Sequence, residues 1–158
     1  MARILLLWLF LISPTLASEV LGIYFTPSKD CEDSIVLHID RASVVNIAVY
    51  SINNDGIVAA IKRAQERGAK VQVITDRLQA AGRSSKVEEL ILAGVPLKKH
   101  RKHKIEHNKF AVFDGRIVVT GSFNWTNPAS NANSENCVFI EDSDERYLQR
   151  FEYLWSIY

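Results

Sequence analysis

Short runs of β-branched and aromatic residues alternate with amphipathic stretches along most of this chain. The runs predict strands at residues 20–25, 44–51 and 71–75. The amphipathic stretches carry apolar residues on one helical face and predict helices over about 30–42, 53–68, 85–94 and 143–157. Alternation of this kind is typical of an α/β domain. A chain of 158 residues with 47% hydrophobic side chains is long enough to form one hydrophobic core but not two, so we predict a single domain.

The first 17 residues have a different pattern. Arg3 is followed by an unbroken apolar stretch at 4–12 and then by the small-residue site Thr15-Leu16-Ala17. This order of charge, apolar stretch and cleavage site is that of a secretory signal peptide. The apolar stretch is less than half as long as a helix needs to cross a bilayer. We therefore expect export to the periplasm or beyond, with cleavage near Ala17 and a mature domain of residues 18–158; retention as an anchor is the alternative.

Charge is balanced over the chain but uneven along it. Lys and Arg number 19 and Asp and Glu 18, and Arg3 accounts for the difference, so residues 18–158 are formally neutral. This balance excludes a globally basic nucleic-acid binder and requires any such affinity to be local. Basic residues concentrate at 98–104, and we predict a groove that follows a phosphate backbone, lined by Lys98, Lys99, Arg101, Lys102 and Lys104. A solvated charged face is the alternative, and we expect His38, His100 and His103 to be solvated or to line the groove.

A hairpin is predicted at Asp114-Gly115, because this dipeptide lies between two strand-like runs and suits a two-residue turn with positive φ. In that register Phe113 faces Arg116, and successive pairs lead back along the strands to His107 facing Ser122. The side chains brought to one face are then His107, Lys109, Ser122 and Asn124. The opposite face, directed to the core, carries Phe110, Val112, Ile117 and Val119. Asp114 lies in the turn, away from the four polar groups.

Such a set of four polar side chains suits a phosphate. A neutral imidazole can attack phosphorus, while lysine, serine and asparagine supply a cation and hydrogen-bond donors for the anionic phosphoryl group. Each residue alone is more typical of a surface or a loop. Their convergence on one face is what indicates a phosphate site.

The spacing of these residues also matches a known family. His107-x-Lys109, four further residues, Asp114, six further residues and Gly121-Ser122-x-Asn124 together form the signature of the phospholipase D superfamily, named for its His, Lys and Asp. Similarity at residues 24–27, 48–52, 67–71 and 133–136 extends over nearly the whole mature chain. The chain resembles the short bacterial endonucleases of that superfamily. The resemblance implies a phospholipase D-like fold, with a mixed β-sheet flanked by helices on both faces.

The resemblance also implies a role for each site residue. His107 is expected to be the nucleophile that forms a phosphohistidine, with Lys109, Ser122 and Asn124 holding the phosphate. Glu135 falls where these nucleases place a carboxylate against the other histidine nitrogen, which would fix the tautomer and stabilise the positive ring. Asp114 and Gly121 are expected to support the site structurally.

A single copy of the motif makes a prediction about assembly. Attack by one histidine requires an acid to protonate the leaving oxygen, and the resembled superfamily takes that acid from a second motif. A two-fold symmetric homodimer would bring two copies of His107 into one shared active site.

We expect no cofactor and no obligatory metal, because the sequence has no His-Glu-x-x-His motif, no paired Asp cluster and no cysteines at zinc spacing. Cys31 and Cys137 could pair in an oxidising compartment or remain as separate buried residues.

The sequence therefore predicts a metal-independent phosphodiesterase that cleaves the DNA or RNA backbone with little sequence specificity. One alternative is a phospholipase that acts on cardiolipin or a related anionic phospholipid with the same residues. The other is a catalytically silent nucleic-acid-binding module.

Overall fold

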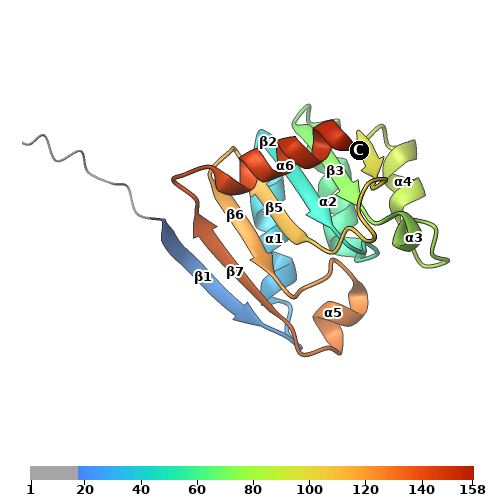
Figure 1. Ribbon diagram of the computed structural model, residues 1–158. Helices are drawn as coiled ribbons and strands as arrows, with labels where there is room; N and C mark the ends of the chain where they lie inside the picture. The colour runs from blue at the N-terminus through green and yellow to red at the C-terminus, as the bar shows by residue number, and fades with distance from the viewer. Residues whose placement is uncertain (1–17) are drawn as a thin grey trace, which may run out of the picture.

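A seven-stranded mixed sheet forms the centre of the protein in the computed structural model, which describes residues 18–158 (Figure 1). The strands occur in the spatial order β1-β7-β6-β5-β2-β3-β4. Their bounds are β1 Glu19–Phe25, β2 Val44–Val49, β3 Lys70–Thr75, β4 Leu97–Lys99, β5 Lys109–Phe113, β6 Ile117–Gly121 and β7 Asn136–Glu141. The β2–β3 and β3–β4 pairs are parallel and the other pairs are antiparallel. The predicted signal peptide lies outside the described residues.

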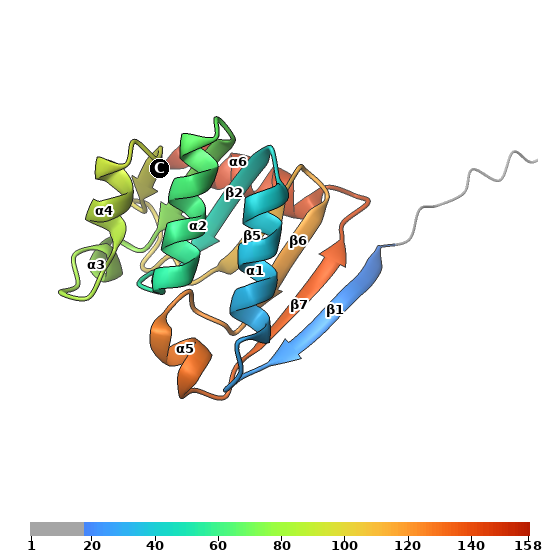
Figure 2. The same cartoon turned by 180° about the vertical axis from the view of Figure 1, so that it is seen from behind.

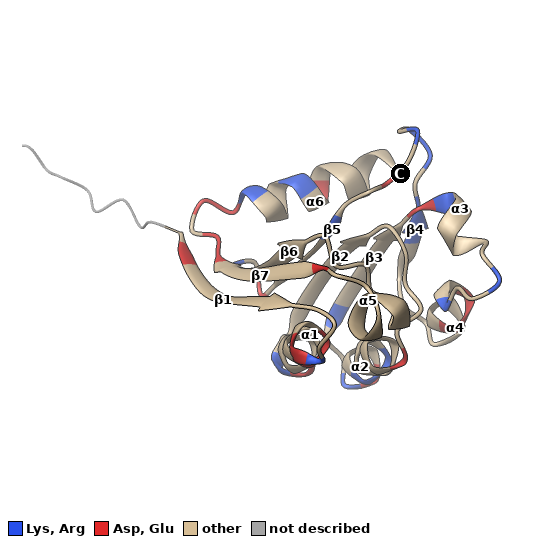
Figure 3. Cartoon of the chain, turned by 90° about the horizontal axis from the view of Figure 1, so that it is seen from below, with Lys and Arg blue, Asp and Glu red and all other residues tan. Residues whose placement is uncertain are grey.

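Helices cover both faces of this sheet, as the family resemblance implied. Helices α1 (Asp30–Arg41) and α2 (Asp55–Glu66) lie on one face, and α6 (Arg146–Ile157) crosses the other (Figures 2 and 3). Three shorter helices complete the fold: α3 Arg77–Ala80, α4 Val87–Leu92 and α5 Asn127–Asn131. Within the described part of the chain, no helix is long and apolar enough to span a bilayer.

The core consists of two layers separated by the sheet. The larger cluster lies between the sheet and helices α1 and α2 and includes Ile35, Ile47 and Ile61. The smaller cluster lies beneath α6 and includes Phe110, Val118 and Phe151. Since the central strands are buried on both faces, their sequences are nearly continuous apolar runs, as is typical of the centre of such sheets.

The predicted elements are present, with their ends displaced by a few residues. Helix α2 begins as its sequence indicates, because the Asn54 side chain accepts a hydrogen bond from the Ile57 amide at 2.9 Å and caps the first turn. Helix α6 begins at Arg146, three residues later than predicted. Four elements are not predicted by the sequence pattern, namely β4, β7, α3 and α5. Of these, β4, α3 and α5 have at most five residues each, too few to show a periodic pattern.

The predicted hairpin is present, but its predicted register is wrong by one residue. Phe113 pairs with Ile117 instead of Arg116, and Ala111 pairs with Val119. Asp114 and Gly115 have the expected positive φ of 48° and 80°, but Arg116 also belongs to the connection. A shift of one residue exchanges the faces of β6, so Val118 packs with Phe110 under α6. Both faces of this hairpin are buried, and its apolar pattern therefore does not select one register.

A disulfide joins Cys31 of α1 to Cys137 of β7, with 6.1 Å between their Cα atoms. The two cysteines are 106 residues apart in sequence. The bond therefore fastens the first helix to β7, the strand next to the edge strand β1. This resolves the alternative that the sequence left open.

Candidate active site

One pocket of about 410 Å³ gathers six residues of the predicted site: His107, Lys109, Gly121, Ser122, Asn124 and Glu135. It lies at the edge of the sheet where β5 begins, β6 ends and the chain enters β7. Strands β2 and β3 end at the same edge, so the loops that follow them also lie there. The structure therefore brings together all five predicted catalytic residues.

The loop after β6 explains why these residues meet even though the predicted register of the hairpin was wrong. At Gly121 the chain leaves the strand, and the amides of Ser122 and Phe123 both donate to the carbonyl of Asn136, at 3.1 and 3.2 Å. Phe123 enters the core while Ser122 stays exposed in the pocket. The pocket therefore depends on this loop and not on continued strand alternation.

Gly121 is required by the close approach of β7. A Cβ atom at this position would collide with the carbonyl oxygen of Asn136 and would lie 2.9 Å from the Cα of Cys137. Backbone contact this close excludes a side chain. Gly121 thereby lets the loop that carries Ser122 and Asn124 pack against the start of β7.

Glu135 is held at the pocket by backbone and side-chain hydrogen bonds. Its amide donates to the Thr26 hydroxyl at 2.9 Å, and its carbonyl accepts from the Thr26 amide at 3.0 Å. Its carboxylate accepts from the Ser122 hydroxyl at 2.5 Å and from the Asn133 amide at 3.1 Å. The carboxylate is thus engaged with Ser122, whereas the resemblance implied a contact with His107. The role implied for Glu135 stays a prediction.

Lys109 provides a half-buried cation beside His107. Its ammonium donates to the carbonyl of His107 at 2.8 Å and lies 5.1 Å from the centre of the Tyr50 ring. Burial lowers the pKa of Lys109, and the negative charges of Glu135 and Glu106 partly oppose this shift. A cation with little exposure to solvent interacts more strongly with a bound anion than an exposed one does.

Asn124 lines the same pocket, and its side-chain oxygen is buried. Its Oδ1 has no hydrogen-bond partner among the described residues. An unsatisfied buried amide is costly, and such groups usually receive a partner from a ligand or water.

Tyr50 is a further neighbour of the site, and no motif in the sequence marks it. Its ring contacts the imidazole of His107 in an edge arrangement, with 4.6 Å between centroids. Its hydroxyl accepts from Gln79 Nε2 at 3.0 Å. The sequence placed Tyr50 at the end of a predicted strand, which is where side chains reach an α/β active site.

Comparison with known proteins agrees with this arrangement. The family model described as "Cardiolipin synthase, PLD-like domain" matches residues 35–155. A phospholipase D from Rickettsia felis is 37% identical over 143 residues, which cover 89% of this chain and 71% of the relative. The chain belongs to the phospholipase D superfamily. Its residues 107–124 therefore form the motif for which that superfamily is named.

Two further relatives show how far the likeness extends. The crystal structure of Nuc, a phospholipase D family member from Salmonella typhimurium, superposes with a TM-score of 0.82 at 28% identity, covering 89% of this chain and 96% of Nuc. A mitochondrial cardiolipin hydrolase from Chlamydomonas reinhardtii is 33% identical over 116 residues, which cover 72% of this chain. The chain spans about half the length of that hydrolase, with 52% of it covered.

Asp114, the aspartate of the phospholipase D motif, lies at the opposite end of β5 from the pocket. Its Oδ1 accepts hydrogen bonds from the amides of Ser43 and Val44, both at 2.9 Å. It therefore ties the β5–β6 turn to the start of β2. This is a structural contact, away from the pocket that holds His107 and Lys109, as its place in the turn predicted.

The basic run before the motif is not a uniform exposed stripe. Lys98 Nζ donates to the carbonyl of Trp155 at 2.6 Å and lies over its ring, so this lysine packs against α6. The side chains of Lys99, Arg101, Lys102 and Lys104 are exposed, as the predicted groove requires. Strand β4 explains why Lys98 and Lys99 differ, because both pair with β3 and successive side chains of a strand point to opposite faces.

Two of the three other histidines were wrongly predicted. His100 is 2% exposed and lies 3.2 Å from Asp76, so it is an internal residue instead of a solvated one. His38 is partly buried, stacks on Phe139 at 4.6 Å and bonds to the carbonyl of Ser34. Only His103 is exposed as predicted.

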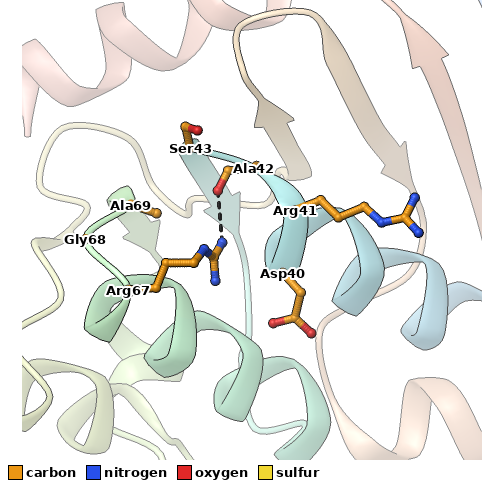
Figure 4. A pocket seen from close by; sticks show the side chains of 7 residues that line it. All are labelled: Asp40, Arg41, Ala42, Ser43, Arg67, Gly68 and Ala69. Atoms are coloured by element: carbon orange, nitrogen blue, oxygen red, sulfur yellow. Dashed lines mark hydrogen bonds between the residues drawn. The ribbon is translucent and has the colours of Figure 1, made fainter.

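A second pocket, of about 370 Å³, lies at the opposite end of the sheet, where β2 and β3 begin (Figure 4). There the Arg67 guanidinium donates to the carbonyls of Ile39 and Ala42, at 2.7 and 2.9 Å. Arg67 thereby satisfies the last carbonyls of α1. We assign this pocket a structural role.

In residues 18–158 there is no group of three acidic, histidine or cysteine side chains that could hold a metal ion.

Proposed function

We propose that this protein is a metal-independent phosphodiesterase that cleaves through a phosphohistidine on His107. The observation that carries the proposal is the single pocket in which His107, Lys109, Ser122 and Asn124 converge. Membership of the phospholipase D superfamily supports it.

In the first step an imidazole nitrogen of His107 attacks phosphorus, and the bond to the leaving ester oxygen breaks as that oxygen takes a proton. The Lys109 cation stabilises the negative charge on the phosphoryl oxygens, and Ser122 and Asn124 orient the group by hydrogen bonds. In the second step a water oxygen attacks phosphorus, the N–P bond breaks and the water gives up its proton. Both steps need a group that alternately donates and accepts a proton.

We infer that this group is His107 of a second copy of the chain. Within residues 18–158, His38, His100 and His103 do not line the pocket. A two-fold homodimer would supply the second imidazole opposite the first. His107 is exposed at the edge of the sheet, which leaves it accessible to such a partner.

The favoured substrate is a nucleic acid. Exposed basic side chains at Lys99, Arg101, Lys102 and Lys104 lie on the segment that leads directly to His107. Several cations close to a phosphate site favour a polyanion over a single phosphodiester, because each further phosphate that they neutralise adds electrostatic affinity. We therefore propose an endonuclease with little sequence specificity, acting on DNA or RNA.

An anionic phospholipid is the second candidate, and one feature favours it. The edge strand β1 exposes Val20, Ile23 and Phe25, and Phe25 is 67% exposed. Phe25 pairs with Asn136, the neighbour of Glu135, so an apolar strip lies next to the pocket. Relatives that are named phospholipase D and mitochondrial cardiolipin hydrolase agree with this candidate. Apolar strips beside a polar site are typical of contact with a lipid surface.

We also propose that the protein is exported. The apolar stretch at residues 4–12 with the small-residue site near Ala17 supports export, and so does the disulfide between Cys31 and Cys137, since disulfides persist in oxidising compartments.

Incubation of the purified protein with plasmid DNA, RNA and cardiolipin vesicles, each in excess chelator, tests the function. We expect cleavage of nucleic acid in chelator and none by the His107→Asn variant, which should still bind DNA. Cleavage of cardiolipin alone would select the lipid candidate. Activity that vanishes in chelator and returns with a divalent metal would refute the metal-independent mechanism.

A further inference from the structure

The loop of residues 101–105 projects from the fold between two buried residues, His100 and Glu106. Both contact the same oxygen of one carboxylate. His100 Nδ1 accepts from the Arg77 amide at 2.9 Å and lies 3.2 Å from Asp76 Oδ2, and the Glu106 amide donates to that oxygen at 3.1 Å. Asp76 and the amide of the adjacent Arg77 therefore hold the two ends of the loop that precedes His107.

Asp76 is itself held rigidly. It caps α3, where its Oδ1 accepts from the amides of Leu78 and Gln79 at 2.8 and 3.0 Å, and it is 1% exposed. Burial acts to raise the pKa of Asp76, but hydrogen bonds from the backbone outweigh that effect and the pKa is lowered. Asp76 is therefore an ionised acceptor fixed at the end of β3.

The carboxylate of Glu106 connects the residues on both sides of His107. Its Oε1 accepts from the backbone and side-chain amides of Asn108, at 3.2 and 2.5 Å. The Asn108 carbonyl in turn accepts from the amide of Tyr50 at 2.8 Å. The peptides before and after His107 are thus fastened to each other and to β2, while the imidazole remains free to face the pocket.

Tyr158, just after α6, completes this network. Its hydroxyl donates to Glu106 Oε2 at 2.8 Å and also contacts Nδ1 of His103 in the loop. Burial and the hydrogen bond to Glu106 raise the pKa of the Tyr158 phenol, so it stays protonated and able to donate. The end of α6 is thereby linked to the residue that precedes the nucleophile.

We propose that Asp76, Glu106 and Tyr158 are positioning residues that hold the His107 imidazole in line for attack on phosphorus. This inference rests on the proposed function of His107. Precise orientation of a nucleophile contributes strongly to rate, and a displacement of about 1 Å can cost about a hundredfold. None of the three lines the pocket, so they act through the backbone on either side of His107.

The test uses the full chain and a small substrate, bis(4-nitrophenyl) phosphate, which does not reach the loop of residues 101–105. We expect Glu106→Gln and Tyr158→Phe each to lower kcat about tenfold with KM changed less than twofold, because orientation is impaired while the phosphate-binding groups stay in place. The loss in the double variant should be smaller than the product of the two single losses, since both changes affect the hydrogen bond between Tyr158 and Glu106. Asp76→Asn should also lower kcat.

Tyr153→Phe is the matched control, because Tyr153 lies on α6, is 51% exposed and contacts Arg150 instead of Glu106. It should leave kcat unchanged. Hydrogen exchange gives a second readout: the amides of residues 100–108 should exchange faster in Glu106→Gln and Tyr158→Phe than in the control.

The outcomes separate this inference from the function on which it rests. Faster exchange or a lower Tm with unchanged kcat would show that the network only braces the fold, and would overturn the positioning role. Multiplicative losses in the double variant would also overturn it. A parent chain without phosphodiesterase activity, or a His107→Asn variant that keeps it, would overturn the proposed function and this role with it.

Discussion

The ring of Tyr50 contacts the imidazole of His107, with their centroids 4.6 Å apart and their planes inclined by 62°. Tyr50 follows β2 and His107 precedes β5, and these two strands are antiparallel neighbours. The same ring lies beneath the Lys109 ammonium, and its hydroxyl is bonded to Gln79. One aromatic side chain therefore borders both the proposed nucleophile and the proposed phosphate-binding cation.

Removal of this ring should impair catalysis more than removal of its hydroxyl. We expect Tyr50→Leu to lower kcat about tenfold, because the imidazole loses the surface that restricts its orientation. Tyr50→Phe keeps the ring and should stay within about twofold of the parent. Steady-state kinetics with a small phosphodiester measures both. Equal losses in the two variants would assign the effect to the Gln79 hydrogen bond instead.

The pH dependence should show the charge state of Lys109. Burial lowers the pKa of Lys109. The alkaline loss of activity should therefore begin at a lower pH than the pH at which an exposed lysine loses its proton. Glu135→Gln removes a negative charge that raises this pKa, and should move the alkaline limb to lower pH. Lys109→Arg should abolish that limb, since arginine keeps its charge. A pH–rate profile checks the parent and both variants. An alkaline limb that persists in Lys109→Arg would belong to another group.

The exposed basic residues in the loop of residues 101–105 should govern the binding of long DNA. Reversal of charge at Arg101, Lys102 and Lys104 should weaken the binding and reduce the slope of log K against log salt by about 0.9 for each phosphate that is no longer neutralised. Lys98→Met is the matched control, because Lys98 packs on Trp155, and it should leave the slope unchanged. Binding isotherms at several salt concentrations give the slope. A slope that the reversals do not alter would place the DNA elsewhere.

Mixed dimers should reveal a shared site. When parent chains exchange subunits with an excess of His107→Asn chains, most parent chains enter dimers that hold one His107 instead of two. Activity per parent chain should then fall steeply, because attack and leaving-group protonation need both imidazoles. Activity proportional to the amount of parent chain, together with a monomeric mass in solution, would contradict the shared site.

The disulfide should contribute to stability without forming part of the site. It closes a long loop between α1 and β7, and replacement of both Cys31 and Cys137 by serine should lower the free energy of unfolding by about 2–5 kcal/mol. Urea denaturation of this variant, and of the parent with and without reductant, measures the loss. The kcat of the folded variant should remain near that of the parent.

The sequence by itself determined the principal elements and the family. Apolar periodicity reports local backbone structure, and Asn54 before α2 and Asp114-Gly115 in the hairpin show that caps and turns are local as well. The spacing from His107 to Asn124 could be recognised because those residues lie on one hairpin and the loop that follows it, within 18 positions of sequence. Their arrival in one pocket followed from that short separation.

Only the tertiary structure decided the register of β5 and β6, the pairing of Cys31 with Cys137, and the contacts of Asp76. The register was ambiguous because apolar residues occupy both faces of β6, and packing against α6 and α1 chooses between them. The burial of His100 was hidden in a run of charges, since it depends on a carboxylate that lies 24 positions earlier in the chain. Contacts of this kind arise when helices and strands pack together, and no local pattern of residues encodes them.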